Sequence, residues 1–414
     1  MSPVSEFRPR TGSIPAQRGP DASEIVETVE PARPVEDQPA TPARRLPGVL
    51  YAVLLYATLR AAALVTLAAF AAADPRHFAL RQLLTRYDAI WYARIAEHGY
   101  DQAVPLGADG APWVTNLAFF PLYPGLVALV KLLLPVHVST AELLVSWSAG
   151  LAAAAGLYAL GAHLKDRRTG ILLAGLWAVL PHGLVESMGY SETLFTALTA
   201  WSLLAVLRRQ WLTAAVLCVA AGLTRPTAAA LIAAVALAAL VAVCRRPGEW
   251  RAWCALVLAP LGLLGFLAWV GVRLGRFDGY FYVQNEAWKM RFDGGPYTVR
   301  KMGTLMTTPL PLSVAVTTAV LAGAVLLLVI GIGEKLPWPL LVYSGVTLLL
   351  VIGGEGYYPS KARLLLPAFP LLLPVAYAIG RSRNRTVPFV VLAGLTALSA
   401  LYGVYLCLVW KFSP

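Results

Sequence analysis

Residues 47–73 read PGVLYAVLLYATLRAAALVTLAAFAAA and contain one charged side chain, Arg60. The stretch exceeds the roughly 20 apolar residues that a helix needs to cross the hydrocarbon core of a bilayer. Similar apolar runs follow along the chain. We therefore predict an all-α integral membrane protein whose first membrane-spanning helix covers residues 47–73. Arg60 lies about halfway along this helix, where it needs a polar partner that the sequence does not name.

The composition supports this class of protein. Of the 414 residues, 58% are hydrophobic and 14% are charged, and the mean hydropathy is +0.65. Soluble domains carry roughly 25% charged residues. The formal net charge of +12 does not indicate a nucleic-acid partner, because the basic residues stand in short clusters between apolar runs.

No residue pattern indicates a metal site or a disulfide framework. The five histidines are scattered, and four cysteines lie within or at the edges of apolar runs without CxxC spacing: Cys218, Cys244, Cys254 and Cys407. We interpret the cysteines as small membrane residues. Spacing predicts no cofactor, but it leaves open a divalent cation held with the help of Asp88, Glu97 and His98.

Residues 1–46 differ from the rest of the chain. They are rich in Pro, Glu, Arg and small residues and show no hydrophobic periodicity, which predicts a disordered cytoplasmic tail. They lack the apolar core of a signal peptide, so the first span is expected to act as an uncleaved signal. Residues 47–414 then form a single transmembrane domain.

The basic clusters predict the orientation in the cell membrane. Arg44 and Arg45 precede the first span, so we expect a cytoplasmic N-terminus. Later clusters are expected on the same side, at 165–168, 208–209, 245–251 and 381–385. This arrangement predicts eleven spans, at about 47–73, 141–163, 171–188, 192–207, 211–224, 226–244, 252–272, 310–332, 338–353, 363–380 and 387–410.

One apolar run does not fit as a span. Residues 117–135 are long enough to cross, but a crossing would place the Lys165 cluster and every later basic cluster outside. We predict a helix along the outer membrane surface, within a first external loop at 74–140. The alternative is a true crossing and twelve spans. The second large external loop covers 273–310, and a third polar segment covers 354–363.

Residues 86–100, in the first external loop, are dense in charged and aromatic side chains. If this segment is helical, one face carries Asp88, Trp91, Tyr92 and Ile95. A partly desolvated carboxylate in that position can act as a general base. The alternative is an interfacial helix anchored by its aromatic residues, in which Asp88 caps the helix or pairs with Arg86.

Further polar residues are expected at external helix ends. Glu186 and Glu192 flank one junction, either as two carboxylates that face an outer cavity or as parts of a turn with Ser191 as a helix N-cap. Arg225 interrupts a long apolar stretch. It is expected either to bind a phosphate or to extend to the lipid headgroups.

Five stretches carry a resemblance to a known family. They are Tyr87–Tyr92 with Ile95–Tyr100, Ala118–Pro124, Tyr190–Phe195, Gly222–Thr227 and Lys361–Pro370. In this order they resemble the PIG-V mannosyltransferases, from about residue 47 onward. The family commonly has Trp-Asp where this chain has Tyr87-Asp88, and it usually has Arg-Ser-Asn where this chain has Arg225, Pro226 and Thr227.

The resemblance implies a GT-C-type helix bundle that transfers a sugar from a polyprenyl-phosphate donor on the side away from the cytosol. It makes Asp88 the catalytic base for attack of an acceptor hydroxyl with inversion. Arg225, Lys361 and Arg363 become candidates for stabilising the leaving phosphate. The full set of substrate-binding candidates is Arg86, Trp91, Tyr92, Glu97, His98, Tyr190, Glu192, Arg225, Lys361 and Arg363.

Donor sugar and acceptor stay open at this stage. Mannose is the family default, and the Ala-, Leu- and Arg-rich composition is typical of a bacterial member, whose acceptor could be a lipid, a glycan or a protein. Two other functions are compatible with the chain: a transporter or flippase of a lipid-linked sugar, and a non-catalytic assembly protein. Transporters place polar residues near the membrane midplane, whereas most charges here are predicted at external helix ends.

Overall fold

The computed structural model describes residues 47–305, 307–309, 311–384 and 386–414. The tail predicted at 1–46 lies outside these residues. The helices up to residue 222 are α1 (Gly48–Ala73), α2 (Leu80–Leu84), α3 (Asp88–His98), η1 (Asn116–Ala118), α4 (Leu122–Leu133), α5 (Val138–Leu164), α6 (Arg167–Ala178), η2 (Gly183–Ser187), α7 (Glu192–Leu207) and α8 (Trp211–Gly222).

The remaining elements include two short strands. They are α9 (Ala228–Arg245), α10 (Trp250–Leu258), α11 (Leu261–Leu274), α12 (Gly279–Tyr282), η3 (Val283–Ala287), β1 (Arg291–Phe292), α13 (Pro296–Thr304), α14 (Leu312–Gly333), α15 (Trp338–Gly353), β2 (Gly354–Glu355), α16 (Ser360–Leu364), η4 (Phe369–Leu372), α17 (Leu373–Arg381), α18 (Thr386–Val404) and η5 (Tyr405–Val409).

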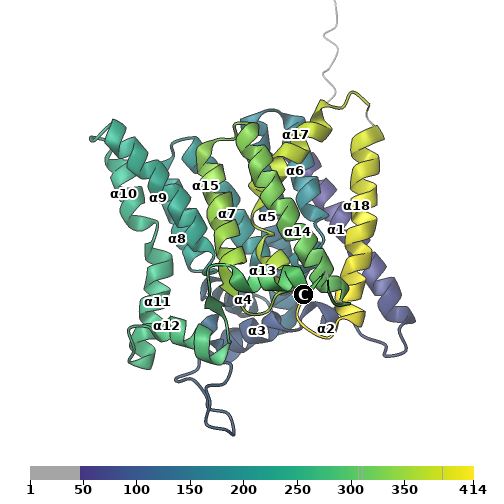
Figure 1. Ribbon diagram of the computed structural model, residues 1–414, viewed down its shortest axis with the longest axis vertical. Coiled ribbons are helices and arrows are strands. Elements are labelled where there is room, and N and C mark those ends of the chain that lie inside the picture. Colours follow the sequence, from purple (N-terminus) through teal and green to yellow (C-terminus); the bar gives the residue numbers. More distant parts are fainter. Residues whose placement is uncertain (1–46, 306, 310, 385) are drawn as a thin grey trace, which may run out of the picture. The chain divides into compact units, whose positions relative to one another are not determined.

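The long helices run up and down in one bundle, and short elements such as α3, α4 and α13 gather at its lower end in Figure 1. Within the described residues, six helices are long and apolar enough to cross a membrane: Gly48–Ala73, Val138–Leu164, Ala228–Arg245, Trp250–Leu274, Leu312–Gly333 and Thr386–Val409. Shorter apolar helices, among them α7, α8 and α15, lie between them. The chain is therefore a multi-pass helical membrane protein, as predicted.

Two predicted spans are interrupted by 3-10 helices in the structure. The span expected at 171–188 is α6, which ends at Ala178, followed by the 3-10 helix η2. Pro181 explains the break, because proline removes a backbone donor and restricts the residue before it. The span expected at 363–380 is likewise divided into α16, η4 and α17 by prolines at positions 367, 370 and 374.

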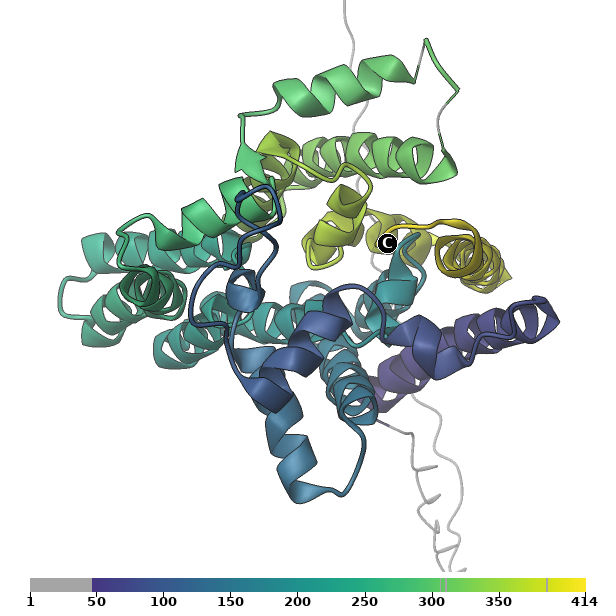
Figure 2. The same ribbon diagram turned by 90° about the horizontal axis from the view of Figure 1, so that it is seen from below.

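The apolar run at 117–135 forms a short helix. Its regular part, α4, has 12 residues and spans about 18 Å, well short of the roughly 30 Å hydrocarbon core. Figure 2 shows α3 and α4 lying across the end of the bundle. Tyr92 of α3 and Tyr123 of α4 meet edge to face, with ring centroids 4.7 Å apart. This geometry suits the predicted interfacial helix.

Glycines allow neighbouring helices to approach closely. A Cβ added at Gly161 of α5 would lie 2.7 Å from the Cα of Gly170 in α6. Such a distance excludes any side chain at position 161 unless a helix moves. The tight α5–α6 contact forms part of the main apolar core, together with Trp177 of α6 and Tyr56 of α1, whose rings stack 5.2 Å apart.

Arg60 has polar partners in the middle of the bundle. Its Nε and Nη2 donate to Ser187 Oγ at 3.1 and 2.9 Å, and its Nη1 donates to the carbonyl oxygen of Ala178 at 3.0 Å. Glu186, the residue before Ser187, is also buried near Arg60. The break between α6 and η2 thus provides the partners that the sequence could not name.

Candidate active site

Asp88 is the first residue of α3, where the helix dipole favours a negative charge. Tyr87 before it adopts φ 60° and ψ −114°, which non-glycine residues rarely do. This turn starts α3 beside α16, although the two helices are far apart in the sequence. Asp88 Oδ2 lies 2.7 Å from Arg363 Nη2 of α16, and 22% of the Asp88 side chain remains exposed.

A second carboxylate continues the row of charges. Glu192 Oε1 lies 3.2 Å from Arg363 Nε and 2.7 Å from Arg225 Nη1. The Glu192 side chain is only 1% exposed, so the two guanidinium groups compensate a charge that water cannot reach. We call this row of alternating charges, Asp88, Arg363, Glu192 and Arg225, the charged centre.

The charged centre has unused hydrogen-bonding capacity. Neither carboxylate oxygen of Glu192 accepts a hydrogen bond within the described residues, despite the two short ion-pair contacts. Buried polar atoms in native proteins are usually satisfied. A ligand with hydroxyl groups would supply the missing donors. The formal charges of the four residues cancel, so an anionic ligand would have to displace a carboxylate from its arginine.

Two hydroxyl groups connect α3 to the charged centre. Tyr92 Oη and Ser191 Oγ lie 2.8 Å apart, and Arg225 Nη1 donates to Ser191 Oγ at 3.1 Å. Burial raises the pKa of Tyr92, so its hydroxyl stays protonated at neutral pH. Ser191 precedes α7, but its side chain does not cap the helix. It binds the charged centre instead, contrary to the N-cap interpretation.

Residues close to position 414 cover Arg363 from another side. Arg363 Nη1 donates to Ser413 Oγ at 3.2 Å, and Tyr357 Oη donates to the Ser413 carbonyl oxygen at 3.0 Å. Trp410 Nε1 donates to Tyr357 Oη at 2.8 Å. The Arg363 guanidinium also lies 5.1 Å from the ring centroid of Tyr190. Arg363 is therefore held in one orientation by its ion pairs, by the Tyr190 ring and by the hydrogen bond to Ser413.

Other predicted site residues on or just before α3 lie outside the charged centre. Arg86 stacks over the ring of Phe78 at 4.4 Å. Glu97 pairs with Lys131 of α4 at 2.7 Å, and this contact lowers the pKa of the Glu97 carboxyl. His98 is an exposed residue at the end of α3. These side chains attach α3 to its surroundings or face outward.

Trp91 joins an aromatic cluster beside the charged centre. Its ring stacks on Phe119 with centroids 5.9 Å apart and meets Trp288 edge to face at 5.4 Å. Trp288 in turn donates from Nε1 to the Thr115 carbonyl oxygen at 3.0 Å. Through this cluster, Trp91 connects the segment at 74–140 with the segment at 273–310.

Lys361 points away from Arg363 despite their closeness in sequence. Its ammonium donates to the carbonyl oxygens of Val351, at 2.6 Å, and of Gly354. Its Nζ also lies 5.9 Å from the ring centroid of Tyr297. The structure therefore places Lys361 at the β1–β2 pair, where Arg291 opposes Glu355, and not in the charged centre.

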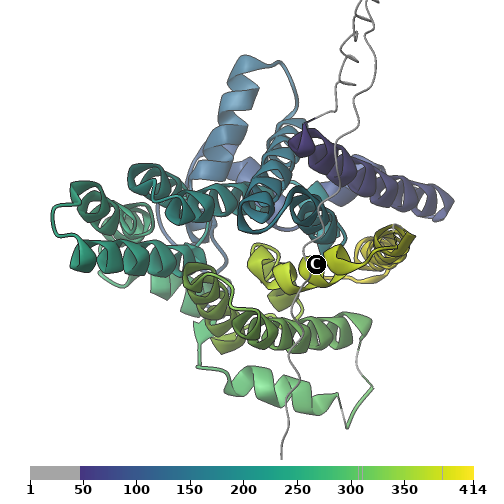
Figure 3. The same cartoon turned by 90° about the horizontal axis from the view of Figure 1, so that it is seen from above.

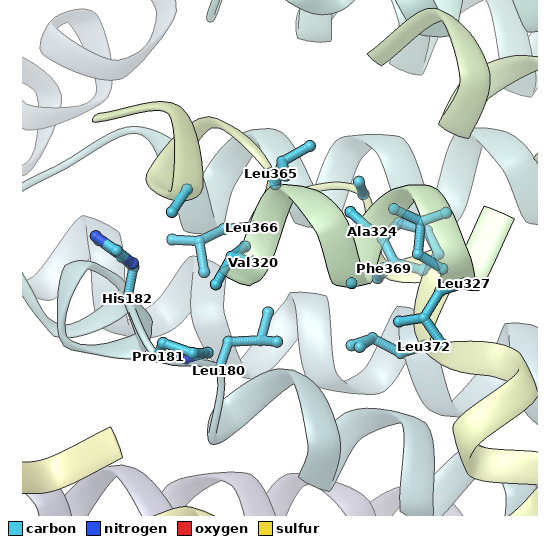
Figure 4. A pocket seen from close by; sticks show the side chains of 14 residues that line it. Leu180, Pro181, His182, Val320, Ala324, Leu327, Leu365, Leu366, Phe369 and Leu372 are labelled. Atoms are coloured by element: carbon cyan, nitrogen blue, oxygen red, sulfur yellow. The ribbon is translucent and has the colours of Figure 1, made fainter. Parts of the chain in front are cut away.

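An apolar cavity of about 190 Å³ begins close to Arg363. Leucines and Phe369 line it, as Figure 4 shows, and His182 stands at one end. The His182 ring is 2% exposed, and neither ring nitrogen has a hydrogen-bond partner within the described residues. Ala362, next to Arg363 on α16, also lines the cavity. Leu365 lines it too, so residues on either side of Arg363 in the sequence border the cavity, whereas Arg363 itself does not line it.

Comparison with solved structures identifies the fold. The chain is similar to ArnT from Cupriavidus metallidurans in a crystal structure with bound undecaprenyl phosphate, with a TM-score of 0.51, 13% sequence identity, and coverage of 86% of this chain and 75% of that one. The apo structure of the same ArnT gives a TM-score of 0.45 at 13% identity, covering 76% and 69%. The fold is GT-C. No family model and no curated protein matches the chain.

Two parts of the candidate site had no signal in the sequence. Ser413 follows the last apolar run, with nothing to place it at Arg363. His182 stands in a loop that was expected to be a membrane span. Pro181 is the signal that could have revealed the break at His182, whereas the sequence holds no comparable signal for Ser413. Within the described residues, no group of three or more His, Cys, Asp or Glu side chains is arranged to hold a metal ion.

Proposed function

We propose that this protein is a glycosyltransferase that transfers a sugar from a lipid-phosphate donor to an acceptor hydroxyl. The observation that carries the proposal is the charged centre beside an apolar cavity. Two buried guanidinium groups suit a phosphate, and the cavity next to Arg363 suits the lipid chain attached to that phosphate. The exposed edge of Asp88 leaves a carboxylate accessible to the acceptor.

The proposed reaction is a single displacement. Asp88 takes the proton of the acceptor hydroxyl, whose oxygen forms a bond to the anomeric carbon of the sugar. The bond between that carbon and the phosphate oxygen breaks with inversion, and the lipid phosphate leaves with the electron pair. Arg363 and Arg225 stabilise the negative charge on the leaving phosphate. As the phosphate attracts Arg363, Asp88 loses its ion-pair partner and becomes a better base.

The finer assignments are part of the same proposal. The PIG-V resemblance of five stretches supports mannose as the sugar and an extracytoplasmic site. The GT-C neighbour ArnT was crystallised with undecaprenyl phosphate, which supports a polyprenyl phosphate as the lipid of the donor. The remaining substrate-binding candidates, Trp91, Tyr92 and Tyr190, are aromatic residues in or beside the charged centre, as expected for side chains that pack against a sugar ring.

Asp88→Asn tests the catalytic assignment. Membranes that contain the protein are supplied with polyprenyl-phosphate mannose carrying a radiolabelled sugar, and the label in lipid, glycan and protein fractions is measured. We expect Asp88→Asn to reduce transfer by about 100-fold or more, because the carboxylate no longer takes the proton. The matched control is Asp109→Asn, which removes a carboxylate from the tip of the first external loop and should leave transfer unchanged.

The outcomes separate the alternatives. Full transfer by Asp88→Asn at normal expression would exclude Asp88 as the base. Movement of the labelled donor across the bilayer without formation of a new glycosidic bond would indicate a flippase and contradict the proposed glycosyltransferase. Formation of free polyprenyl phosphate, detected by mass spectrometry, by the wild type but not by the variant would support the displacement even before the acceptor is known.

A further inference from the structure

A second cavity lies at the opposite end of α7 from the charged centre. Glu192 begins α7 and Arg209 follows its end, and the 16 residues of the helix span about 24 Å. The cavity has a volume of about 530 Å³ and lies between the C-terminal ends of α7 and α9 and the start of α15. Figure 3 views the molecule from this end.

Three exposed arginines line this cavity: Arg209, Arg245 and Arg246. In the part of the chain that the structure describes, none of their side chains forms an ion pair or a hydrogen bond, although Glu249 lines the same cavity. Like charges around one space repel each other. An anion in the cavity would relieve this repulsion.

The other half of the wall is apolar. Val206 and Leu207 of α7 and Val241 of α9 line it, and two tryptophans, Trp211 and Trp338, stand beside the arginines. Tryptophan is enriched where hydrocarbon meets headgroups. Trp338 is also the first residue of α15, whose N-terminus carries a partial positive charge. The cavity therefore offers a cationic side and an apolar side to one ligand.

The backbone at Arg209 provides an independent observation. Arg209 has φ 56°, its N–H donates to the Val206 carbonyl oxygen at 3.0 Å, and Gln210 N–H donates to that of Ala205 at 2.8 Å. This is the hydrogen-bond pattern of a Schellman motif, in which glycine normally occupies the left-handed position. An arginine there is conformationally disfavoured, and it differs from Lys335, which adopts the same conformation, in lining this cavity.

We propose that this cavity binds the anionic headgroup of a phospholipid. The three guanidinium groups hold the phosphate, and the first part of the lipid chains lies against the apolar wall. A free phosphate ion would use the cationic side only, so the apolar half favours a lipid. The site is separate from the proposed sugar transfer and does not depend on it.

Arg209→Gly is the decisive variant. Glycine suits the left-handed position, so the variant keeps the end of α7 folded while it removes one guanidinium group. Purified, delipidated protein in detergent is titrated with phosphatidylglycerol, phosphatidylcholine or inorganic phosphate, and bound lipid is counted by native mass spectrometry. We expect phosphatidylglycerol to bind the wild type, and Arg209→Gly to weaken this binding by roughly tenfold.

Lys335→Gly is a matched control. Lys335 follows the end of α14 with φ 55°, and Leu336 N–H donates to the Gly331 carbonyl oxygen at 3.1 Å, the same arrangement as at Arg209. Lys335 lines a different cavity, which also contains the Glu334–Arg381 ion pair. The variant removes an equal charge from the same end of the bundle and should bind phosphatidylglycerol as the wild type does.

Three results would overturn the proposal. Unchanged phosphatidylglycerol binding by Arg209→Gly would show that the cavity is not the site. An equal loss in Lys335→Gly would show that only the general surface charge matters. Equal affinity for phosphatidylcholine, or competition by millimolar inorganic phosphate, would assign the cavity to something other than an anionic lipid headgroup.

Discussion

The Arg363 guanidinium lies 2.7 Å from the Asp88 carboxylate, although α16 and α3 are separated by most of the chain. The same guanidinium contacts Glu192 at 3.2 Å. One arginine therefore holds together the starts of α3 and α7 and is 9% exposed while it does so. Its loss would leave two carboxylates facing each other across a poorly hydrated space.

Arg363→Gln should lower the free energy of unfolding by about 3 kcal/mol, because it leaves carboxylates in the charged centre without their shared cation. Arg363→Lys should have a smaller effect, since it retains the charge but loses the planar fork that reaches both carboxylates. Thermal unfolding in detergent measures both changes. A loss in Arg363→Lys as large as in Arg363→Gln would mean that fork geometry, and not charge, stabilises the centre.

Glu192 and Arg225 should behave as a coupled pair. Glu192→Gln and Arg225→Gln should each destabilise the fold, because each leaves a buried charge with fewer partners. The double variant should be more stable than the sum of the single effects predicts, by about 1 to 3 kcal/mol. A double-mutant cycle in chemical denaturant gives this coupling energy. Strict additivity would contradict the ion pair at 2.7 Å.

Because of Lys361, we expect the free energy of unfolding to change with pH in the alkaline range. Burial lowers the pKa of its ammonium group to about 8. The unfolded chain, with an ordinary lysine pKa near 10.5, then binds more protons than the folded protein between these values. Stability from this group should therefore rise as the pH increases from about 8 towards 10.5.

Lys361→Met removes the titrating group while keeping a side chain of similar length. The difference in melting temperature between wild type and variant should change across the pH 8 to 10.5 window and stay constant between pH 6 and 7. A parallel pH dependence of the two proteins would exclude Lys361 as the source.

Gly161 should not tolerate even a methyl group. Gly161→Ala places a Cβ 2.7 Å from the Gly170 Cα, so α5 and α6 must separate, at a cost of about 1 to 3 kcal/mol. Gly323→Ala is the control, because nothing lies within 4 Å of its added Cβ and alanine favours the helix. The melting temperature should fall for the first variant and stay level or rise for the second.

The sequence could predict which segments form membrane helices, because apolar runs mark the helices and basic clusters mark the loops between them. The positions at which two of these helices are interrupted were not predicted. The runs at 171–188 and 363–380 are apolar enough to cross, but their prolines end regular helix early. Hydropathy reports whether a side chain prefers lipid or water. Where a helix ends also depends on whether its last carbonyl groups find hydrogen-bond donors elsewhere in the fold, as the Ala178 carbonyl does in Arg60.

The charged residues of the candidate site were identified, but their grouping was not. Asp88 stood out through the charged and aromatic segment around it and the PIG-V resemblance, Glu192 through its place at a junction of two apolar runs, and Arg225 through its interruption of an apolar stretch. Lys361 and Arg363 were expected to act as a pair. Residues at i and i+2 of a helix do not face each other, so α16 directs them to different partners. The contact between Arg363 and Ser413 joins residues 50 positions apart in the sequence, and no motif around either residue predicts it.

Three helices of the bundle are too short for an ordinary bilayer. The helices α7, α8 and α15 have 16, 12 and 16 residues, so they span about 24, 18 and 24 Å, against a hydrocarbon core of roughly 30 Å. The membrane must thin around them, or their ends must lie below the headgroups. In either case the start of α7 at Glu192, and with it the charged centre, comes to lie near the hydrocarbon region of one leaflet. A lipid-borne sugar could reach Asp88 while its chain stays in the leaflet, and bilayer thickness would then help to set the rate of the reaction.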